Sequence, residues 1–220
     1  KLFNYTCLMA YPVPAKEIRR EIVIGGSRFI ATLAPVFSVD EAKAFIARVK
    51  REFDDATHNV PAFLIGGGKS VTAHASDDGE PSGTAGRPAL AVLRGSGLGD
   101  VALVVTRYYG GTKLGTGGLV KAYTQAAQAV VLAVPRAQKV MAHTALLAVP
   151  YSLLEQTRLL VKGKGGEILD EEFAADVMMT IRFPVEKFDD FEEGLQELSA
   201  GKLSAEIMET GEILLKIGSS

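Results

Sequence analysis

The sequence predicts an α+β protein of two domains, residues 1–138 and 139–220. Its 220 residues exceed the roughly 150 that one domain commonly contains. Strand-like runs and amphipathic helices are interspersed along the whole chain. The charge balance also changes near residue 138, because 16 of the 24 Lys and Arg residues but only 11 of the 26 Asp and Glu residues precede that point.

The composition is that of a globular protein, with 47% hydrophobic and 23% charged residues. These proportions exclude a disordered tail, a collagen-like fibre and a coiled-coil rod. There is no uncharged apolar run of 18 residues that would predict a membrane span, and residues 1–11 do not resemble a secretory leader. With Cys7 as the single cysteine, we expect a packed thiol in a cytoplasmic protein.

In the first domain, β-prone runs at 17–24 and 28–35 flank a Gly25-Gly26-Ser27 turn and predict a hairpin. Ser38 and Glu41 form a capping box that begins an amphipathic helix over 39–53. A short strand is expected over 60–65.

The remainder of the first domain is predicted to contain two loops. Residues 66–88 lack periodicity and are expected to form a long loop, of the kind that is usually functional or disordered. A helix over 88–93, a buried strand over 101–108, a glycine loop over 110–118 and an Ala-rich helix over 119–134 follow.

The second domain has a different pattern. Strands are expected over 140–150, 167–173, 177–184 and 204–216, and helices over 152–162 and 186–199, the first of them begun by a second capping box at Ser152 and Glu155. This βαββαβ order predicts the ferredoxin-like split βαβ arrangement. That scaffold serves many functions and names none of them.

The first stretch with chemical potential is SDDGEPSGTAGRP, residues 76–88. Its three carboxylates, from Asp77, Asp78 and Glu80, can supply oxygen ligands to Mg²⁺. Alternatively, Asp and Gly here only form tight turns. No metal site is predicted from this pattern, and these three residues remain the candidates if one exists.

The second stretch is TRYYGGTKLGTGGLVK, residues 106–121, in which a β-prone run leads through a glycine-rich loop into a helix. Glycines let main-chain N–H groups approach a ligand closely, and a helix N-terminus favours phosphate. Basic side chains add charge, and Tyr108 and Tyr109 can stack on bases. The residues predicted to bind phosphate or nucleic acid are Arg87, Arg107, Tyr108, Tyr109, Gly110, Gly111, Lys113, Gly115, Thr116, Gly117, Gly118 and Lys121.

A structural interpretation of the same residues stays open. The glycines can permit close packing of helix on sheet, and the tyrosines can belong to the core. The spacing matches neither a P-loop nor a GxGxxG fingerprint, and the chain has no HExxH, paired CxxC or GxSxG motif. His58 and His143 are expected to be structural.

The two stretches, SDDGEPSGTAGRP and VVTRYYGGTKLGTGGLVKAY, closely resemble motifs of the IMPACT/YigZ family, as does Ala56-Thr57-His58-Asn59. The βαββαβ half is similar to the extra domain of the bacterial members, which itself resembles a C-terminal domain of elongation factor G. The motif residues without an individually proven role are Asp77, Asp78, Gly79, Glu80, Gly83, Thr84, Gly86, Arg107, Tyr108, Gly110, Gly111, Leu114, Gly115, Gly117 and Gly118.

The resemblance implies an N-terminal fold shared with the second domain of a small-subunit ribosomal protein and with sugar and mevalonate kinases. It also implies a link to translation, because eukaryotic relatives are regulators that compete for a ribosome-associated activator of the amino-acid-starvation kinase. For bacterial relatives, nucleic-acid binding is the usual conjecture. Many relatives have Cys where this chain has Val60, which excludes a Cys–His pair at that place.

Three functions follow as hypotheses. The first is a non-enzymatic module in translation that binds RNA or a ribosome-associated protein without a cofactor. The second is a Mg-dependent enzyme on a phosphorylated small molecule or nucleotide, with Asp77, Asp78 or Glu80 as metal ligand or base. The third is a protein-interaction domain whose acidic C-terminal half suits a basic partner.

Overall fold

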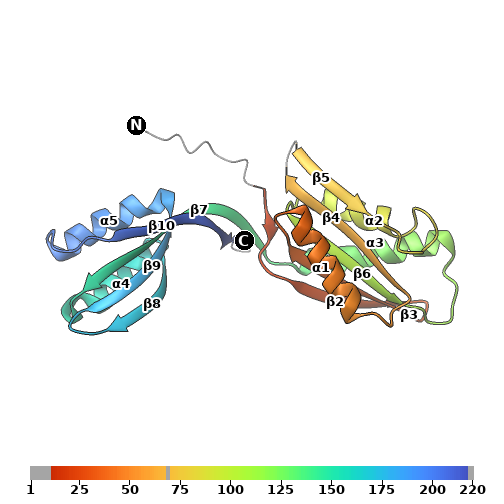
Figure 1. Ribbon diagram of the computed structural model, residues 1–220, viewed down its shortest axis with the longest axis horizontal. Helices are drawn as coiled ribbons and strands as arrows, with labels where there is room; N and C mark the ends of the chain where they lie inside the picture. Colours follow the sequence, from red (N-terminus) through yellow and green to blue (C-terminus); the bar gives the residue numbers. More distant parts are fainter. Residues whose placement is uncertain (1–10, 68–69, 218–220) are drawn as a thin grey trace. The chain divides into compact units, whose positions relative to one another are not determined.

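The computed structural model describes residues 11–67 and 70–217 (Figure 1). Two compact units divide between Gln138 and Lys139, and the chain re-enters the first unit at Leu215. The division coincides with the change in charge balance along the sequence. None of the described helices is long and apolar enough to cross a membrane, and Cys7 lies outside the described residues.

The first unit is built on an antiparallel sheet in which every strand pairs with its neighbours in a continuous register. The central strand is buried from Val101 to Arg107, which fits its unbroken apolar sequence. In spatial order the strands are β2 (Ile18–Ile24), β3 (Ser27–Pro35), β6 (Val101–Tyr108), β4 (His58–Gly67) and β5 (Ser70–Ala75).

Helices cover both faces of this sheet. The helix α1 (Val39–Glu52) packs Ala42, Phe45 and Val49 on one face, whereas α2 (Gly86–Gly95) and α3 (Gly115–Ala133) pack on the other (Figure 1). The predicted cap of α1 is present, because the Ser38 hydroxyl accepts the N–H of Glu41.

Two predictions for the first unit were wrong in extent. The segment 66–88 is not one long loop: it contains β5, which pairs with β4 through Ala62 and Ala75. The helix α3 begins at Gly115 rather than at residue 119. Glycine has poor helix propensity, so the sequence did not predict that residues 115–118 form the first turn of this helix.

The second unit has the predicted βαββαβ order, and its strands lie in the order β10–β7–β9–β8, the ferredoxin-like arrangement. The similarity to elongation factor G and the kinase-like fold of the first unit stay predictions. The elements are β7 (Arg136–Val149), η1 (Tyr151–Leu153), α4 (Leu154–Gly163), β8 (Glu167–Phe173), β9 (Val177–Pro184), α5 (Val185–Ser199) and β10 (Glu206–Lys216). In the first unit, β1 (Val13–Pro14) pairs with the start of β7.

The second predicted capping box is absent. The 3₁₀ turn η1 precedes α4, whose N-cap is Leu153 with no side-chain hydrogen bond. Glu155 instead pairs with Arg158 one turn later. Both helices of this unit pack on the same core, in which Phe183 and Phe191 stack with ring centroids 4.4 Å apart.

Candidate functional site

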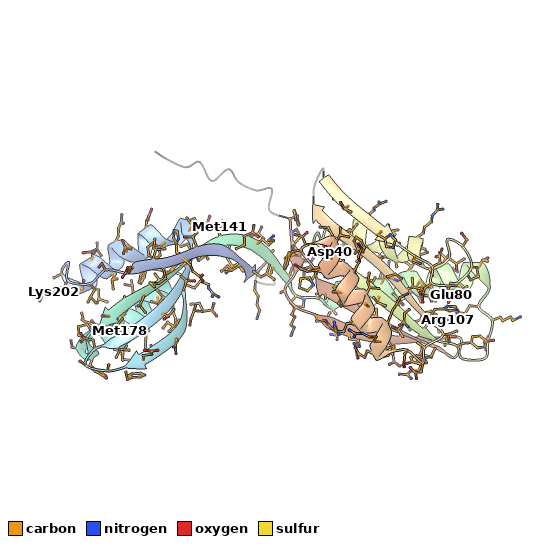
Figure 2. All side chains as sticks on the ribbon, viewed as in Figure 1. Asp40, Glu80, Arg107, Met141, Met178 and Lys202 are labelled. Atoms are coloured by element: carbon orange, nitrogen blue, oxygen red, sulfur yellow. The ribbon has the colours of Figure 1, made fainter. Side chains whose placement is uncertain are left out.

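Both motif stretches lie at one end of the sheet of the first unit. β4 begins there at His58, which is opposite Arg107 near the end of β6. Residues 76–85 lead from β5 into α2, and residues 109–114 lead from β6 into α3. Figure 2 shows Glu80 and Arg107 side by side at this end.

The Asp77 carboxylate caps the N-terminus of α2, although Asp77 precedes the N-cap residue Ala85 in the sequence. Its carboxylate accepts the main-chain N–H groups of Gly83 at 2.8 Å, Ala85 at 3.1 Å and Gly86 at 2.8 Å. Partial burial disfavours the charged carboxylate, but these donors and the charge of Arg87 outweigh it, so the pKa of Asp77 lies below its ordinary value. Asp77 therefore satisfies the N–H groups of the N-cap residue Ala85 and of Gly86, the first residue of α2, from within the motif.

Asp78 ties the same loop to β4 and α1. Its backbone adopts a positive φ of 48°, and its carboxylate accepts the Asn59 N–H at 2.6 Å and pairs with Lys50. The carbonyl oxygen of Asp78 lies 2.8 Å from His58 Nδ1. His58 is thus a structural residue of the loop, as expected.

Glu80 is the buried member of the three. Its Oε1 accepts from Arg107 Nη1 at 2.5 Å and from the Tyr123 hydroxyl at 2.8 Å. Tyr123 is fully buried, and burial together with the Glu80 charge raises the pKa of its hydroxyl. The Nε2 of His58 lies 3.9 Å from the other oxygen of Glu80.

Because of these contacts, the three candidate metal ligands face three different partners. The carboxylate of Asp77 faces the start of α2, that of Asp78 faces β4 and α1, and that of Glu80 faces Arg107. Among the described residues, no group of three or more His, Cys, Asp and Glu side chains is placed to hold a metal ion. The geometry gives Mg²⁺ chemistry no support from these residues.

The loop that contains these three acids is shaped by glycines and a threonine of the same stretch, residues 76–88. Gly79 and Gly83 have positive φ angles of 88° and 77°, which glycine adopts without strain. The hydroxyl of Thr84 donates to the Pro81 carbonyl at 2.7 Å. A Cβ on Gly86 would lie 2.6 Å from the Ser76 carbonyl oxygen. Backbone conformation therefore explains Gly79 and Gly83, and close packing explains Gly86.

The position of Arg107 contradicts its predicted role as a phosphate-binding residue. Arg107 was predicted to face a phosphate, but only 6% of the residue is exposed, and Glu80 already neutralises its charge. Its guanidinium lies 5.5 Å from the Phe29 ring and 5.7 Å from the Tyr109 ring. Arg107 is therefore a buried structural residue beneath the glycine loop.

The two tyrosines are only partly available for stacking. The Tyr108 hydroxyl donates to Asp55 at 2.6 Å, and the Arg28 guanidinium lies 5.3 Å from its ring. The Tyr109 side chain is more open, with 47% of the residue exposed, and its hydroxyl donates to the Gly111 carbonyl at 2.7 Å. Tyr109 is the better placed of the two to meet a ligand.

Gly110 is explained by a close approach of two backbones. Its N–H donates to Ser27 Oγ at 3.1 Å, and a Cβ on Gly110 would lie 1.9 Å from the carbonyl carbon of Gly26. The loop therefore needs a glycine here to pack on the β2–β3 turn. This part of the structural interpretation holds.

The first turn of α3 is different, because neighbouring side chains leave it open. Gly115, Thr116 and Gly117 are exposed, and the N-cap Leu114 makes no side-chain hydrogen bond. No acidic residue occupies the first turn. Within the described part of the chain, no side-chain cap satisfies the N–H groups of this turn, and a helix N-terminus of this kind favours an anion.

Glycine is required by backbone geometry in only part of this segment. Gly111 and Gly115 have φ angles of 86° and 70°, while a Cβ on Gly118 would lie 3.0 Å from Leu114 Cβ. A Cβ on Gly117 would meet nothing within 4 Å outside its own helix, and its φ is not positive. Packing does not explain Gly117.

Two lysines flank this turn. Lys113 and Lys121 are exposed, and within the described part of the chain neither forms an ion pair. Arg87, at the start of α2, is also exposed and acts electrostatically on Asp77. The structure thus leaves Lys113 and Lys121 as the free charges beside the open turn.

Several residues at this end of the sheet were not predicted from the sequence to contribute to it. Tyr123 sits on the buried face of an Ala-rich helix, four residues after Leu119, and only this spacing marks it as inward-facing. Asn59 and Thr106 form a buried hydrogen bond of 2.7 Å. Ser27 Oγ, from the hairpin turn, contacts both Arg107 and Gly110, a contact that no local pattern predicts.

Comparison with known proteins gives consistent results. Residues 25–131 match the Impact N-terminal domain, and residues 147–202 match a domain of unknown function, DUF1949. The IMPACT family member YigZ of Escherichia coli is 38% identical over 87% of this chain and 94% of its own length. An IMPACT family member of Haemophilus influenzae is 37% identical over 92% of this chain and 98% of its own length.

A solved structure agrees with these relatives. A crystal structure described as that of a hypothetical protein covers 91% of this chain and 98% of its own, with 37% identity and a TM-score of 0.59. The matched regions include the two motif stretches and both units. The chain belongs to the IMPACT family.

Proposed function

We propose that this protein is a non-catalytic binding protein of the translation apparatus, and that its first unit binds RNA phosphates at the open first turn of α3. The observation that carries the proposal is the first turn of α3, which has no side-chain cap and is exposed at Gly115, Thr116 and Gly117. Its N–H donors and the positive end of the helix favour an anion.

The charges around the turn agree with an anionic ligand. Lys113 precedes it by two residues and Lys121 follows it, and neither has an ion-pair partner in the described part of the chain. The first unit as a whole is basic, since 16 Lys and Arg residues face 11 Asp and Glu residues in 1–138. A basic surface raises the local concentration of a polyanion and speeds association.

Gly117 supports close approach by a ligand. Glycine inside a helix costs about 1 kcal/mol relative to alanine, and no neighbouring atom within 4 Å requires it here. Without a Cβ, the phosphate oxygens of a ligand can reach the main chain directly. Tyr109, which is exposed at the same end of the sheet, offers a stacking surface for a base.

The place in translation rests on family membership. Resemblance to eukaryotic IMPACT proteins implies a regulator that works beside the ribosome, where RNA phosphates are the dominant surface. Phosphate contacts position a protein on RNA without reading its sequence. The proposed role is therefore sequence-tolerant binding.

Binding of a labelled single-stranded oligouridylate, titrated at several salt concentrations, tests the proposal. Each phosphate contact contributes about 0.7 to the slope of log K against log salt, so Lys113→Ala with Lys121→Ala is expected to reduce the slope by about 1.4. Co-sedimentation with purified ribosomes should weaken in parallel. The matched control is Lys16→Ala with Arg94→Ala, which removes two exposed charges of the same unit that do not flank the first turn of α3; Arg94 lies in the last turn of α2, at the end opposite the motif.

Two outcomes would contradict the proposal. One is the absence of RNA binding at low salt. The other is an equal loss of affinity in the two double variants, because that result would assign the binding to net charge rather than to the turn.

A further inference from the structure

The second unit has a sheet face that neither of its helices covers. Alternate residues of β7 and β9, among them Leu147 and Met179, pack into the core with α4 and α5. Side chains of successive residues in a strand point to opposite faces. The residues between them therefore form the opposite face, here called the open face, whose floor is made by Thr144, Leu146, Ala148, Met178 and Thr180.

Strand register places a row of acids beside this floor. In β8, Asp170 is opposite Thr180 and Glu172 is opposite Met178, and Glu167 is opposite Arg182. All three acids are exposed. Glu167 approaches Arg182 at 4.0 Å, whereas Asp170 and Glu172 form no ion pair with any described residue.

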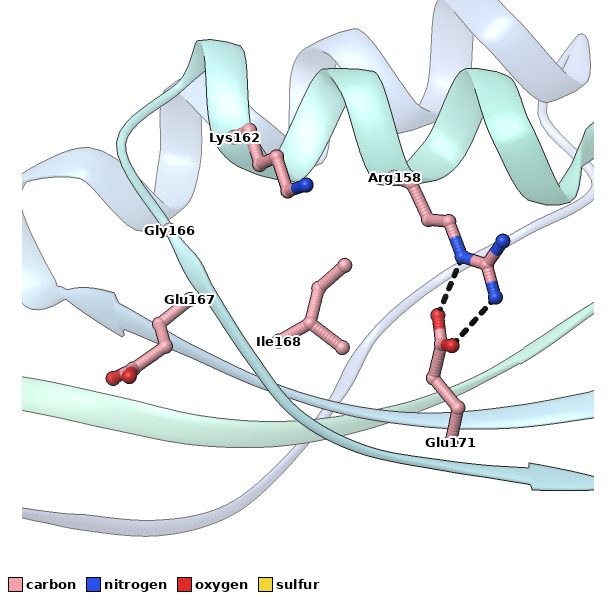
Figure 3. A pocket seen from close by; sticks show the side chains of 6 residues that line it. All are labelled: Arg158, Lys162, Gly166, Glu167, Ile168 and Glu171. Carbon is pink, nitrogen blue, oxygen red and sulfur yellow. Dashed lines mark hydrogen bonds and ion pairs between the residues drawn. The ribbon is translucent and has the colours of Figure 1, made fainter.

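The helix-covered side of β8 contrasts with this row. There Glu171 accepts from Arg158 Nε at 2.8 Å and Nη2 at 2.6 Å, at the wall of a cavity of about 470 Å³ (Figure 3). These hydrogen bonds hold the pKa of Glu171 below its ordinary value. On the helix side Glu171 is thus neutralised by Arg158, whereas on the open face Glu167 has Arg182 as a basic partner and Asp170 and Glu172 have none among the described residues.

The other edge of the open face is also acidic. His143 contacts the Phe188 ring of α5 and lies 2.7 Å from Thr210 Oγ1 of β10, so Thr210 faces the helices. By alternation Glu209 and Ile207 face the other way, and both are exposed. The floor therefore lies between carboxylates on both outer strands.

The dimensions fit one helix. Strands are spaced by about 4.8 Å, so the outer strands of a four-stranded sheet are about 14 Å apart. An α-helix with its side chains is about 10–12 Å across. A helix lying on the floor would bury apolar residues against Leu146 and Met178 and extend basic side chains to the carboxylates at either edge.

We propose that the open face docks a basic amphipathic helix of a partner protein. RNA is disfavoured here because the floor carries no aromatic residue for stacking and its edges repel phosphate. On this proposal, the uneven distribution of charge along the chain reflects two kinds of partner. The basic residues 1–138 bind a polyanion, and the acidic residues 139–220 bind a polycation. The docking surface does not depend on the RNA site at α3.

Methyl NMR of the full chain with labelled methionines tests the proposal. The probe is an amphipathic helical peptide of Leu and Lys, compared with its Leu and Glu counterpart and with oligouridylate. The Lys peptide is expected to shift the Met178 methyl resonance. Met179, next to it but fully buried on the other face, is the internal control and should shift far less.

Charge variants complete the test. Glu167→Gln, Asp170→Asn and Glu172→Gln together should lower affinity for the Lys peptide about tenfold, which corresponds to about 1.4 kcal/mol. The control removes three exposed acids from the helix side, by Glu186→Gln, Glu193→Gln and Glu197→Gln, and should leave affinity within about twofold, because these acids lie outside the proposed contact.

Three results would overturn the docking proposal. Equal losses in the two triple variants would mean attraction by net charge alone. A shift of Met178 by oligouridylate rather than by the Lys peptide would assign the face to RNA. A concentration-dependent shift without any peptide would assign it to a second copy of this chain. None of these results bears on the slope measured with Lys113 and Lys121.

Discussion

Glu80 and Arg107 join the two motif stretches through an ion pair that is almost completely buried. Glu80 Oε1 and Arg107 Nη1 are 2.5 Å apart, and the side chains are only 3% and 7% exposed. Tyr123 donates to the same oxygen. The pair connects the turn before α2 to the end of β6, so two segments that look like binding loops in sequence share one structural anchor.

Removal of one partner of this pair should destabilise the first unit strongly. Arg107→Met leaves the Glu80 carboxylate buried without a counter-charge, which typically costs about 3–5 kcal/mol. Urea unfolding followed by tyrosine fluorescence measures the effect. Glu80→Gln with Arg107→Met should recover part of the loss, because no buried charge then remains unpaired.

The matched control is the exposed pair of Arg28 and Glu21, whose side chains are 52% and 43% exposed. Arg28→Met should cost less than about 1 kcal/mol. If Arg107→Met were as mild as Arg28→Met, the buried pair would not be the anchor described above.

Asp77 should make the stability of the first unit depend on pH in the acidic range. Its pKa is lower in the folded protein than in the unfolded chain, where it is about 3.9, because main-chain donors stabilise the carboxylate. Its contribution is therefore fully present above the unfolded pKa and is lost as the pH falls through the folded pKa.

Asp77→Asn tests this contribution. At neutral pH the variant should be less stable by about 0.5–2 kcal/mol, the usual range for a lost helix cap. Unfolding curves recorded at successively lower pH should converge with those of the parent protein below the folded pKa. A difference that stayed constant down to that pH would show that the charge of Asp77 does not matter.

The sequence predicted most elements because their local patterns agree with the tertiary structure. The helix over 39–53 had a cap and an apolar stripe, and β6 had an unbroken apolar run that only a covered sheet accommodates. The edge strand β5 was missed because its polar residues and flanking glycines read as a loop. Pairing with β4, which is a tertiary interaction, makes that segment a strand.

The candidate site was predictable in composition but not in geometry. Residue type alone predicted an anion site at the glycine-rich turn and Lys113, and the structure leaves Lys113 and residues 115–117 exposed. The burial of Arg107 was not found, because its partner Glu80 lies 27 residues away and only the fold brings the two together. Asp77, Asp78 and Glu80 were the candidate metal ligands because they are close in sequence, but their carboxylates bind partners in different elements, which only the fold reveals.

Gly110 should tolerate no side chain. A Cβ there would lie 1.9 Å from Gly26 carbonyl carbon, and backbone cannot move aside as a side chain can. Gly110→Ala is therefore expected to destabilise the first unit by at least about 1–3 kcal/mol, the range for overpacking. Thermal unfolding of the variant checks this, and an unchanged melting temperature would contradict the close approach.

Gly117 should behave in the opposite way, and this contrast separates ligand-related glycines from structural ones. Gly117→Ala places a methyl group in open space and removes glycine from a helix, so stability should rise by up to about 1 kcal/mol. RNA affinity should nevertheless fall, because the methyl group blocks approach to the N–H groups of the first turn. Gly95→Ala, at the end of α2, has equally open surroundings and should raise stability without changing RNA affinity. If both variants kept full affinity for the oligouridylate, the first turn of α3 would not be where RNA binds.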